Sequence, residues 1–573
     1  MHKRLLGIVA SAAVIVSACG GATTSTAPSA PAATTAPGAS AAPTAVPSQS
    51  DMAADQILHI DLGNEPPTLD PTKAQDSTSI AVLHALTRPL VYFDKDLKVV
   101  PELAEKYEVS ADAKTITFHL RDAKYSNGDQ IVAADLVYSW KRLVDPRIAA
   151  PYSYVTTEIV GAPELAAAAA KKPAPTDAEY AALLDKVGVA APDPKTFVVT
   201  LNTPATYFLT AASLWVFAPI QEKWITSPNA TEAANFVSSG PYIMEKWAHN
   251  SEIVLKPNPN WYGDQKSLLT EIDMTMTAEP AQAQAAFENG ELDMVAPPTE
   301  DIKRIQADPV LGPQVVQIPL FSIGYYDYNY LKGPTANKDF RIALTQAIDK
   351  KAFIDATYSG KGVIANSIIM PGIPGYQKDL DPYPFDLASA KEHMTKALAA
   401  LNVKSAADLG KLKIGFNTGS GHETKVAFLT EAWRQAFGLD FEQVGLEWSV
   451  FLTQRTAGAF DISRDAWGAD YPHANNQLNG LFTCGGGNNN SQYCNKDFDA
   501  LLAKAAQEPD QDKQVAIYNE AQTLLMGDAT VLPLRFAVTT FEVAPYLGGI
   551  NATGSDSQLP GDLFYETMFI KKH

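Results

Sequence analysis

The segment RDAWGADY, residues 464–471, brings opposite charges and aromatic rings together in a short stretch of sequence. A carboxylate such as Asp470, flanked by rings that exclude water, forms a strong charge-assisted hydrogen bond with an ammonium group. The planar guanidinium of Arg464 can bind both oxygens of a carboxylate. These residue types suit a ligand that carries both charges. An internal ion pair between Arg464 and Asp470, or an aspartate that caps a turn, is the structural alternative.

The composition narrows the classes of partner and reaction. The chain has 573 residues, 46% of them hydrophobic, and a formal net charge of −19, which argues against nucleic acid and against electrostatic binding to anionic lipid. The sequence contains no H-E-x-x-H, G-x-S-x-G or S-x-x-K motif and no phosphate loop. We therefore expect a binding protein and not an enzyme, without a cofactor.

The N-terminus predicts export and attachment to a membrane. MHKRLLGIVASAAVIVSACGG has a basic start and an apolar run too short to span a bilayer, which is typical of a signal peptide over 1–18. VSAC, ending at Cys19, resembles the bacterial lipobox, in which the cysteine is lipidated; an ordinary signal peptide with a chance cysteine is the alternative. Residues 19–55 are rich in Ala, Thr, Pro and Ser, as expected of a disordered linker. We predict an extracytoplasmic protein, lipid-anchored to the cell membrane.

Cys484 and Cys494 lie on either side of a loop rich in Gly and Asn, LFTCGGGNNNSQYC. In an oxidising extracytoplasmic compartment, two cysteines this close favour a disulfide. A structural zinc site needs four ligands, and no histidine is nearby, so we expect no metal.

Strand-like and helix-like patterns alternate along the body of the chain. Alternating apolar residues predict strands at 57–63, 115–120, 196–201, 252–258, 271–276 and 413–417. Helical periodicity predicts helices at 337–353 and 423–437, the second ending at Gly438. The fold class is therefore α/β or α+β.

From about residue 57 onward the chain resembles the extracytoplasmic solute-binding proteins of peptide ABC transporters. The resemblance is carried by PTLDPTKAQDS (67–77), the block 85–146, VSSGPYIMEKW (237–247), the 337–353 helix and NKDFDALLAKA (495–505). It implies an α/β, periplasmic-binding-protein-like fold of type II, with two hinged lobes and an extra subdomain. The implied boundaries are 56–88, 220–321 and 533–573 for lobe I, 89–219 for the inserted subdomain II, and 322–532 for lobe III.

The segment GLEWSVFLTQRTAGAFDISRDAWGADY, residues 445–471, is similar to the oligopeptide binders in particular. The resemblance implies that Asp470 binds the ammonium of a peptide and that several cations at different depths bind its carboxylate. The implied ligand-binding residues are Asp470, Arg464, Trp467, Trp448, His422, Arg455, Tyr154 and Tyr471. Asp465 has no such match. After Asp470 the chain leaves the family pattern, because it reads YPHANN where many relatives carry an acidic residue and proline.

The function implied by the resemblance is capture of short oligopeptides and their delivery to an ABC permease. The partners are the membrane subunits of that permease, with their cytoplasmic ATPases, and the protein itself is expected to be a monomer. Two alternatives keep the fold: a non-peptide solute such as an oligosaccharide, metal chelate or opine, or a peptide-sensing surface protein.

Overall fold

The computed structural model describes residues 51–418, 421–486 and 488–573. The predicted signal peptide, the predicted lipidation site Cys19 and nearly all of the predicted linker lie outside these ranges. No helix in the described ranges is both long and apolar enough to cross a bilayer.

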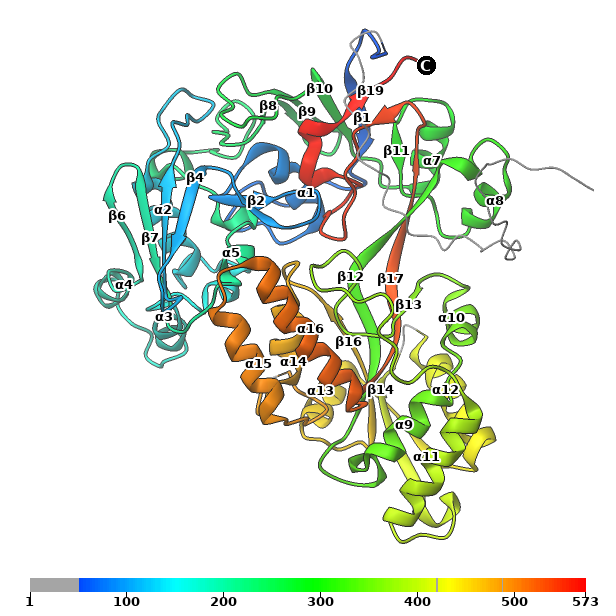
Figure 1. Cartoon of the computed structure of the whole chain (residues 1–573). Helices are drawn as coiled ribbons and strands as arrows, with labels where there is room; N and C mark the ends of the chain where they lie inside the picture. The colour runs from blue at the N-terminus through cyan, green and yellow to red at the C-terminus, as the bar shows by residue number, and fades with distance from the viewer. Residues whose placement is uncertain (1–50, 419–420, 487) are drawn as a thin grey trace, which may run out of the picture. The chain divides into compact units, whose positions relative to one another are not determined.

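The largest sheet has 11 strands and connects two regions of the chain (Figure 1). Its order is β15 (Asp440–Leu446), β14 (Lys411–Asn417), β16 (Ile462–Gly468), β12 (Val315–Tyr328), β17 (Val531–Val543), β11 (Met294–Val295), β1 (Ile57–Asp61), β10 (Glu271–Thr275), β9 (Glu252–Pro257) and β8 (Tyr242–Ala248), with β13 (Val363–Ile364) paired to β17. The long antiparallel strands β12 and β17 pass from one region to the other, with a register shift between Pro319 and Ile323. The expected lobe boundaries, 321/322 and 532/533, fall within these two strands.

A separate antiparallel sheet of four strands forms in the segment expected to be the inserted subdomain. Its order is β4 (Ala104–Val109), β5 (Thr115–Leu120), β7 (Thr196–Thr200) and β6 (Val189–Asp193). In β5 every second side chain is buried, as its alternating sequence predicts. Helix α2 (Ala133–Val144) covers the sheet through Trp140, which packs edge-on against Phe197 with ring centroids 4.8 Å apart.

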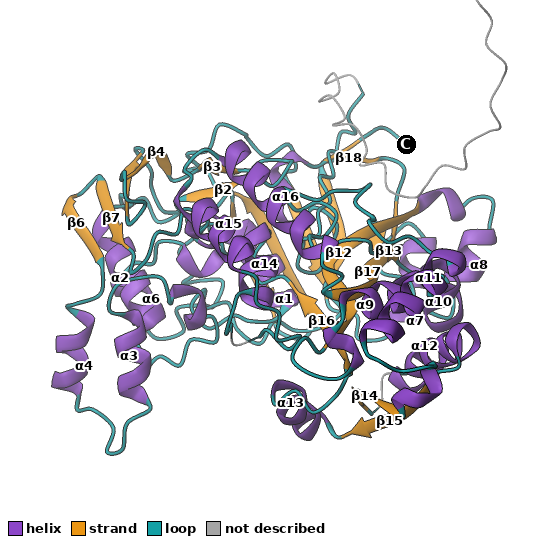
Figure 2. Cartoon of the chain, turned by 60° about the horizontal axis from the view of Figure 1, so that its bottom comes forward, coloured by secondary structure: helices purple, strands orange, loops and turns teal. Residues whose placement is uncertain are grey.

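Two groups of helices lie on opposite sides of the β12–β16–β17 part of the large sheet (Figures 1 and 2). The first group is α9 (Lys338–Gln346), α10 (Lys350–Tyr358), α11 (Leu387–Ala400) and α12 (His422–Phe437). The second group is α14 (Ala474–Phe482), α15 (Lys496–Gln507) and α16 (Gln511–Gly527). Phe340, Phe353 and Val426 of the first group share a core with Tyr326 of β12, whereas Leu478 of the second group belongs to a different core.

The other elements are short and connect these layers. They are α1 (Ser77–Leu86), β2 (Val91–Phe93), β3 (Val99–Pro101), α3 (Ala162–Ala169), α4 (Asp177–Leu184), α5 (Phe208–Ala211), α6 (Glu222–Ile225), α7 (Pro280–Glu288), α8 (Ile302–Ala307), α13 (Trp448–Thr456), β18 (Leu547–Gly548) and β19 (Phe569–Ile570).

The predicted helices need one correction. The single helix expected over 337–353 is wrong, because the structure ends α9 at Gln346 and starts α10 at Lys350. Asp349 causes the break: its backbone is extended, and its carboxylate accepts the backbone N–H of Ala352, which caps a new helix. The expected end at Gly438 is confirmed, since this glycine adopts the left-handed conformation, with φ of 76°, after α12.

Candidate ligand-binding site

Asp470 lies just beyond the end of β16, where neutral groups hold its carboxylate. The side-chain amide of Asn476 donates to one carboxylate oxygen at 2.9 Å, and the hydroxyl of Tyr154 donates to the other at 3.3 Å. Within the described residues no basic side chain forms an ion pair with Asp470, so the pair with Arg464 does not form. The carboxylate is oriented while its charge is left uncompensated, as an ammonium anchor requires.

Asn476 is a site residue that the sequence did not reveal. Besides its bond to the Asp470 carboxylate, its side-chain oxygen accepts the indole N–H of Trp467 at 2.7 Å and the backbone N–H of Asp470 at 3.3 Å. One amide therefore fixes the position of the aspartate and of the neighbouring tryptophan. The departure from the family pattern at YPHANN was the only signal that pointed to this stretch.

His473 explains how the YPHANN segment is held. Its Nδ1 accepts the backbone N–H of Asn475 at 3.1 Å and so caps α14. Its Nε2 lies 3.0 Å from the Gln514 side-chain oxygen. Burial lowers the pKa of His473 to about 4, so the ring is neutral at pH 7 and Nε2–H donates to Gln514. This neutral histidine anchors the helix whose first turn carries Asn476.

A cavity of about 170 Å³ opens beside Asp470. It is lined by apolar and aromatic residues together with a few polar groups, among them Ile80, His84, Tyr152, Trp215, Tyr471 and Ser555. The Tyr471 hydroxyl donates to the side-chain oxygen of Asn475 at 3.0 Å, which turns the ring toward α14. The cavity therefore has the mixed lining typical of a small-molecule site.

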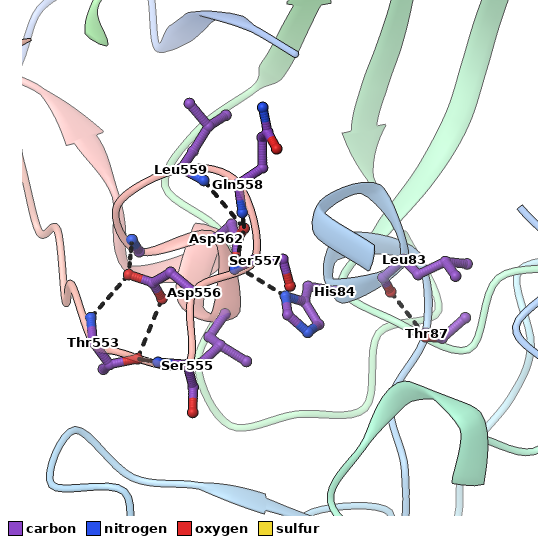
Figure 3. Close-up of polar contacts among 12 residues, drawn as sticks. Leu83, His84, Thr87, Thr553, Ser555, Asp556, Ser557, Gln558, Leu559 and Asp562 are labelled. Carbon is purple, nitrogen blue, oxygen red and sulfur yellow. Dashed lines mark hydrogen bonds and ion pairs between the residues drawn. The ribbon is translucent and has the colours of Figure 1, made fainter. Parts of the chain in front are cut away.

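One wall of this cavity is fixed by a buried carboxylate (Figure 3). Asp562 lies 3.0 Å from Nδ1 of His84 on α1, and its other oxygen accepts the backbone N–H groups of Ser557 and Gln558 at 2.9 and 2.8 Å. Asp556 accepts the backbone N–H of Thr553 at 2.8 Å. Burial and the nearby Asp562 raise the pKa of Asp556 well above its ordinary value. These bonds tie the C-terminal loop to α1.

Arg464 and His422 lie together, at a second place in the site. Arg464 is on β16, is largely buried, and forms no ion pair within the described residues; burial lowers its pKa, but arginine stays charged at neutral pH. His422 is 6% exposed, and its Nδ1 is buried without a hydrogen-bond partner among the described residues. Burial, then the charges of Arg464 and Lys425, lower the pKa of His422 to about 4. This pair can receive an anion.

The charge of Arg455 is paired with a carboxylate of the protein itself. It forms an ion pair with Asp465 in which the side chains are only 12% and 6% exposed, and Asn490 donates to the other oxygen of Asp465 at 2.9 Å. Burial and Asp465 raise the pKa of Asp327 well above its ordinary value. Asp465, to which the sequence assigned no role, is therefore part of a buried network that neutralises the charge of Arg455.

The remaining predicted residues differ in their surroundings. Trp467 is half-buried beside Asp470, whereas Trp448 on α13 is 47% exposed, with its ring centroid 6.1 Å from that of Phe451. The sulfurs of Cys484 and Cys494 lie 2.05 Å apart, as a disulfide. Among the described residues no group of three or more His, Cys, Asp or Glu side chains could hold a metal.

The fold is that of a periplasmic-binding-protein-like protein, and the comparisons with known proteins identify the family. The family model of the bacterial extracellular solute-binding proteins, family 5 (Middle), matches residues 98–489. The chain therefore belongs to the family 5 solute-binding proteins.

Similar proteins extend this likeness over nearly the whole chain. The oligopeptide-binding protein OppA of Bacillus subtilis is 29% identical over 91% of this chain and 94% of its own length. The periplasmic murein peptide-binding protein MppA of Escherichia coli is 29% identical over 92% of this chain and 96% of its own. The unliganded open form of the murein tripeptide-binding protein MppA superposes with a TM-score of 0.82, at 26% identity, over 91% of this chain and 99% of that structure.

Proposed function

We propose that this protein captures short oligopeptides in extended conformation and delivers them to an ABC permease. The observation that supports this proposal is the free edge of β16. β16 pairs with β12 along its whole length but with β14 only at Ile462 and Ser463. Among the described strands, none pairs with residues 464–468 on that edge. An extended peptide can add there as a further strand, with main-chain hydrogen bonds that do not depend on its sequence.

The two charged positions lie at opposite ends of this edge. Asp470 takes the peptide ammonium, covered by Tyr154 and Tyr471, and Arg464 with His422 takes the carboxylate. Because an extended peptide rises about 3.3–3.6 Å per residue, the stretch between Arg464 and Asp470 suits ligands of a few residues. In this proposal Trp467 and Trp448 border side-chain pockets. Arg455 supports the strand through Asp465.

The cavity beside Asp470 is proposed to receive the side chain of the first peptide residue. Its volume of about 170 Å³ is comparable to an apolar cavity that holds benzene, about 150 Å³. An aromatic or branched side chain would therefore fit. The wall formed by His84 and Ser555 offers polar groups to the ligand, so that many side chains are tolerated.

The names of the relatives support a peptide ligand over a sugar, chelate or opine. We further propose that the protein is a monomer, that its lobes divide within β12 and β17, and that they close about a hinge over the bound peptide. Import then requires the permease and its ATPases as partners.

Mass spectrometry of ligands that co-purify with the body of the protein, residues 56–573, tests the proposal. We expect a mixture of short peptides with free amino termini, released on denaturation. The variant Asp470→Asn, purified in parallel, should carry much less peptide. A sugar or a metal chelate in place of peptides would overturn the peptide assignment.

Lipid attachment is proposed at Cys19. We expect Cys19→Ala to move the protein from the membrane fraction to the soluble fraction after export and removal of the signal peptide, since no helix of the described residues can cross a bilayer. Cell fractionation with immunodetection measures this. Ser17→Ala, in the same motif, should stay in the membrane fraction; membrane retention of Cys19→Ala would contradict the anchor.

Peptide binding should raise the pKa of His422 from about 4 toward its ordinary 6.5, because a carboxylate offsets the charge of Arg464 and accepts a hydrogen bond from the ring. The complex then binds more protons than the free protein, so affinity should increase as pH falls from 6.5 to about 5. NMR titration of the His422 ring, assigned with His422→Gln, measures the shift. An unchanged pKa on binding would remove His422 from the site.

A further inference from the structure

We propose that the carboxylate end of the site holds two anionic groups, so that this protein prefers peptides whose last residue is aspartate or glutamate. The second anion position is formed by Arg535 on β17, beside Arg464. This inference rests on the proposed function and names the ligand class of the same site.

Strand register places both arginines on one face of the large sheet. Gly324 of β12 lies directly between Arg535 of β17 and Ala466 of β16, and the next residue on this face of β12, Tyr326, lies opposite Arg464. Side chains that are directly opposite, or two positions apart on one strand, share a face. Two strand spacings, about 10 Å, separate the outer strands, and arginine side chains are long enough to approach one another over that distance.

Tyr358, the last residue of α10, interacts with both arginines. Its ring centroid is 4.0 Å from the Arg535 guanidinium carbon, and it also interacts electrostatically with Arg464. The Lys425 ammonium lies 4.6 Å from the same ring centroid. A Cβ at position 324 would lie 3.9 Å from the Tyr358 hydroxyl, so the glycine leaves the sheet surface open at this point. The arginines thus border one surface.

The charge of these arginines is not balanced within the described residues. Three other arginines have a carboxylate partner, namely Arg88 with Glu566, Arg142 with Asp70 and Arg455 with Asp465. The buried Arg341 has no ion pair within the described residues, but it donates to several backbone carbonyl oxygens, among them those of Ala529 and Thr335. Arg464 and Arg535 form no ion pair there, although burial lowers the pKa of each. The Nε of Arg535 donates to the carbonyl oxygen of Lys361 at 2.6 Å, which positions the guanidinium without neutralising it.

Two neutral groups beside these charges also lack hydrogen-bond partners within the described residues. The Tyr326 hydroxyl and His422 Nδ1 are buried without a hydrogen bond, in residues that are 3% and 6% exposed. A buried polar group without a partner is unfavourable, so both are suited to bind a ligand. Asp465 acts electrostatically on Arg464 but is paired with Arg455, and Glu423, which follows His422, is exposed to solvent.

A single carboxylate can compensate one of the two guanidinium groups. A C-terminal aspartate or glutamate brings its main-chain carboxylate and its side-chain carboxylate together, and so compensates both. A neutral last residue would leave one buried arginine charge unpaired, which is unfavourable. The preference therefore follows from the number of cations and not from the fit of one pocket.

Isothermal titration calorimetry with the exported Cys19→Ala chain, freed of co-purified ligand, tests this preference. The matched probes are Ala-Ala-Ala-Glu and Ala-Ala-Ala-Gln, which have nearly the same shape. We expect the glutamate peptide to bind at least tenfold more tightly, and Arg535→Gln to abolish the difference while both peptides still bind. Arg464→Gln should weaken both peptides.

Wild-type protein alone provides a second test, which does not depend on the folding of a variant. The tenfold preference should shrink when the salt concentration is raised from roughly 0.05 to 0.5 M, because screening acts on the additional charge. Equal affinity for the two peptides would overturn the inference and leave the proposed function intact. Tight binding of Ala-Ala-Ala-Ala-Gln, longer by one residue, would instead make Arg535 an anchor for longer peptides. Failure to bind any of these peptides would overturn the proposed function as well.

Discussion

Asp470→Asn is expected to weaken the binding of peptides with a free amino terminus by about 2–5 kcal/mol, roughly a thirtyfold to several-thousandfold loss of affinity. The substitution keeps the shape of the side chain but removes the charge that faces the ammonium. No other described carboxylate forms part of that arrangement, in which Asn476 and Tyr154 hold Asp470 from either side. Calorimetric titration with a tripeptide measures the loss.

Two controls make this result specific to the ammonium. Acetylation of the peptide should weaken binding to the wild type strongly and to Asp470→Asn only slightly, because the variant has already lost the interaction. Tyr154→Phe removes one donor to the Asp470 carboxylate and leaves the charge, so we expect a loss of about 1 kcal/mol. Equal affinity of wild type and Asp470→Asn for a free-amine peptide would show that the ammonium binds elsewhere.

Arg455→Met should lower the free energy of unfolding by about 3–5 kcal/mol, because it leaves the carboxylate of Asp465 buried beside Asp327 without a counter-charge. Without Arg455, whose charge lowers it, the pKa of Asp327 should rise further. A group whose pKa is raised in the folded state contributes stability at low pH that is lost as pH rises through the folded pKa. The loss of unfolding free energy caused by Arg455→Met should therefore be larger at pH 8 than at pH 5. Denaturant unfolding at both pH values measures it.

Arg464→Met is the matched control for this second prediction. Arg464 is also largely buried but forms no ion pair within the described residues, so its loss should change stability little and weaken peptide binding by about 1.5–3 kcal/mol. Arg455→Met should thus show its main effect in the unfolding assay, and Arg464→Met in the binding assay. If Arg464→Met were as destabilising as Arg455→Met, both residues would be structural, and the carboxylate anchor would have to lie elsewhere.

Local sequence patterns determined much of the secondary structure and the family. Alternation of apolar residues is a property of consecutive positions, and the strand predicted at 115–120 coincides with β5. Gly438 ends α12 because glycine adopts a left-handed conformation at little cost. The resemblance to solute-binding proteins likewise depends on the order of short segments, and the family model over residues 98–489 agrees with it.

Tertiary structure alone decided which charged groups face one another. Arg455 and Arg464 look alike in sequence, yet one is bound by Asp465 and the other is left without an ion pair within the described residues. Asn476 reaches Asp470 only because α14 turns back onto the end of β16. Arg535 shares a face of the sheet with Arg464 only through the register of β12 with both neighbouring strands. The physical reason is that helix and strand patterns depend on neighbours along the chain. Charge pairing depends on distance in space, which is set by strand register and helix packing over long separations in sequence.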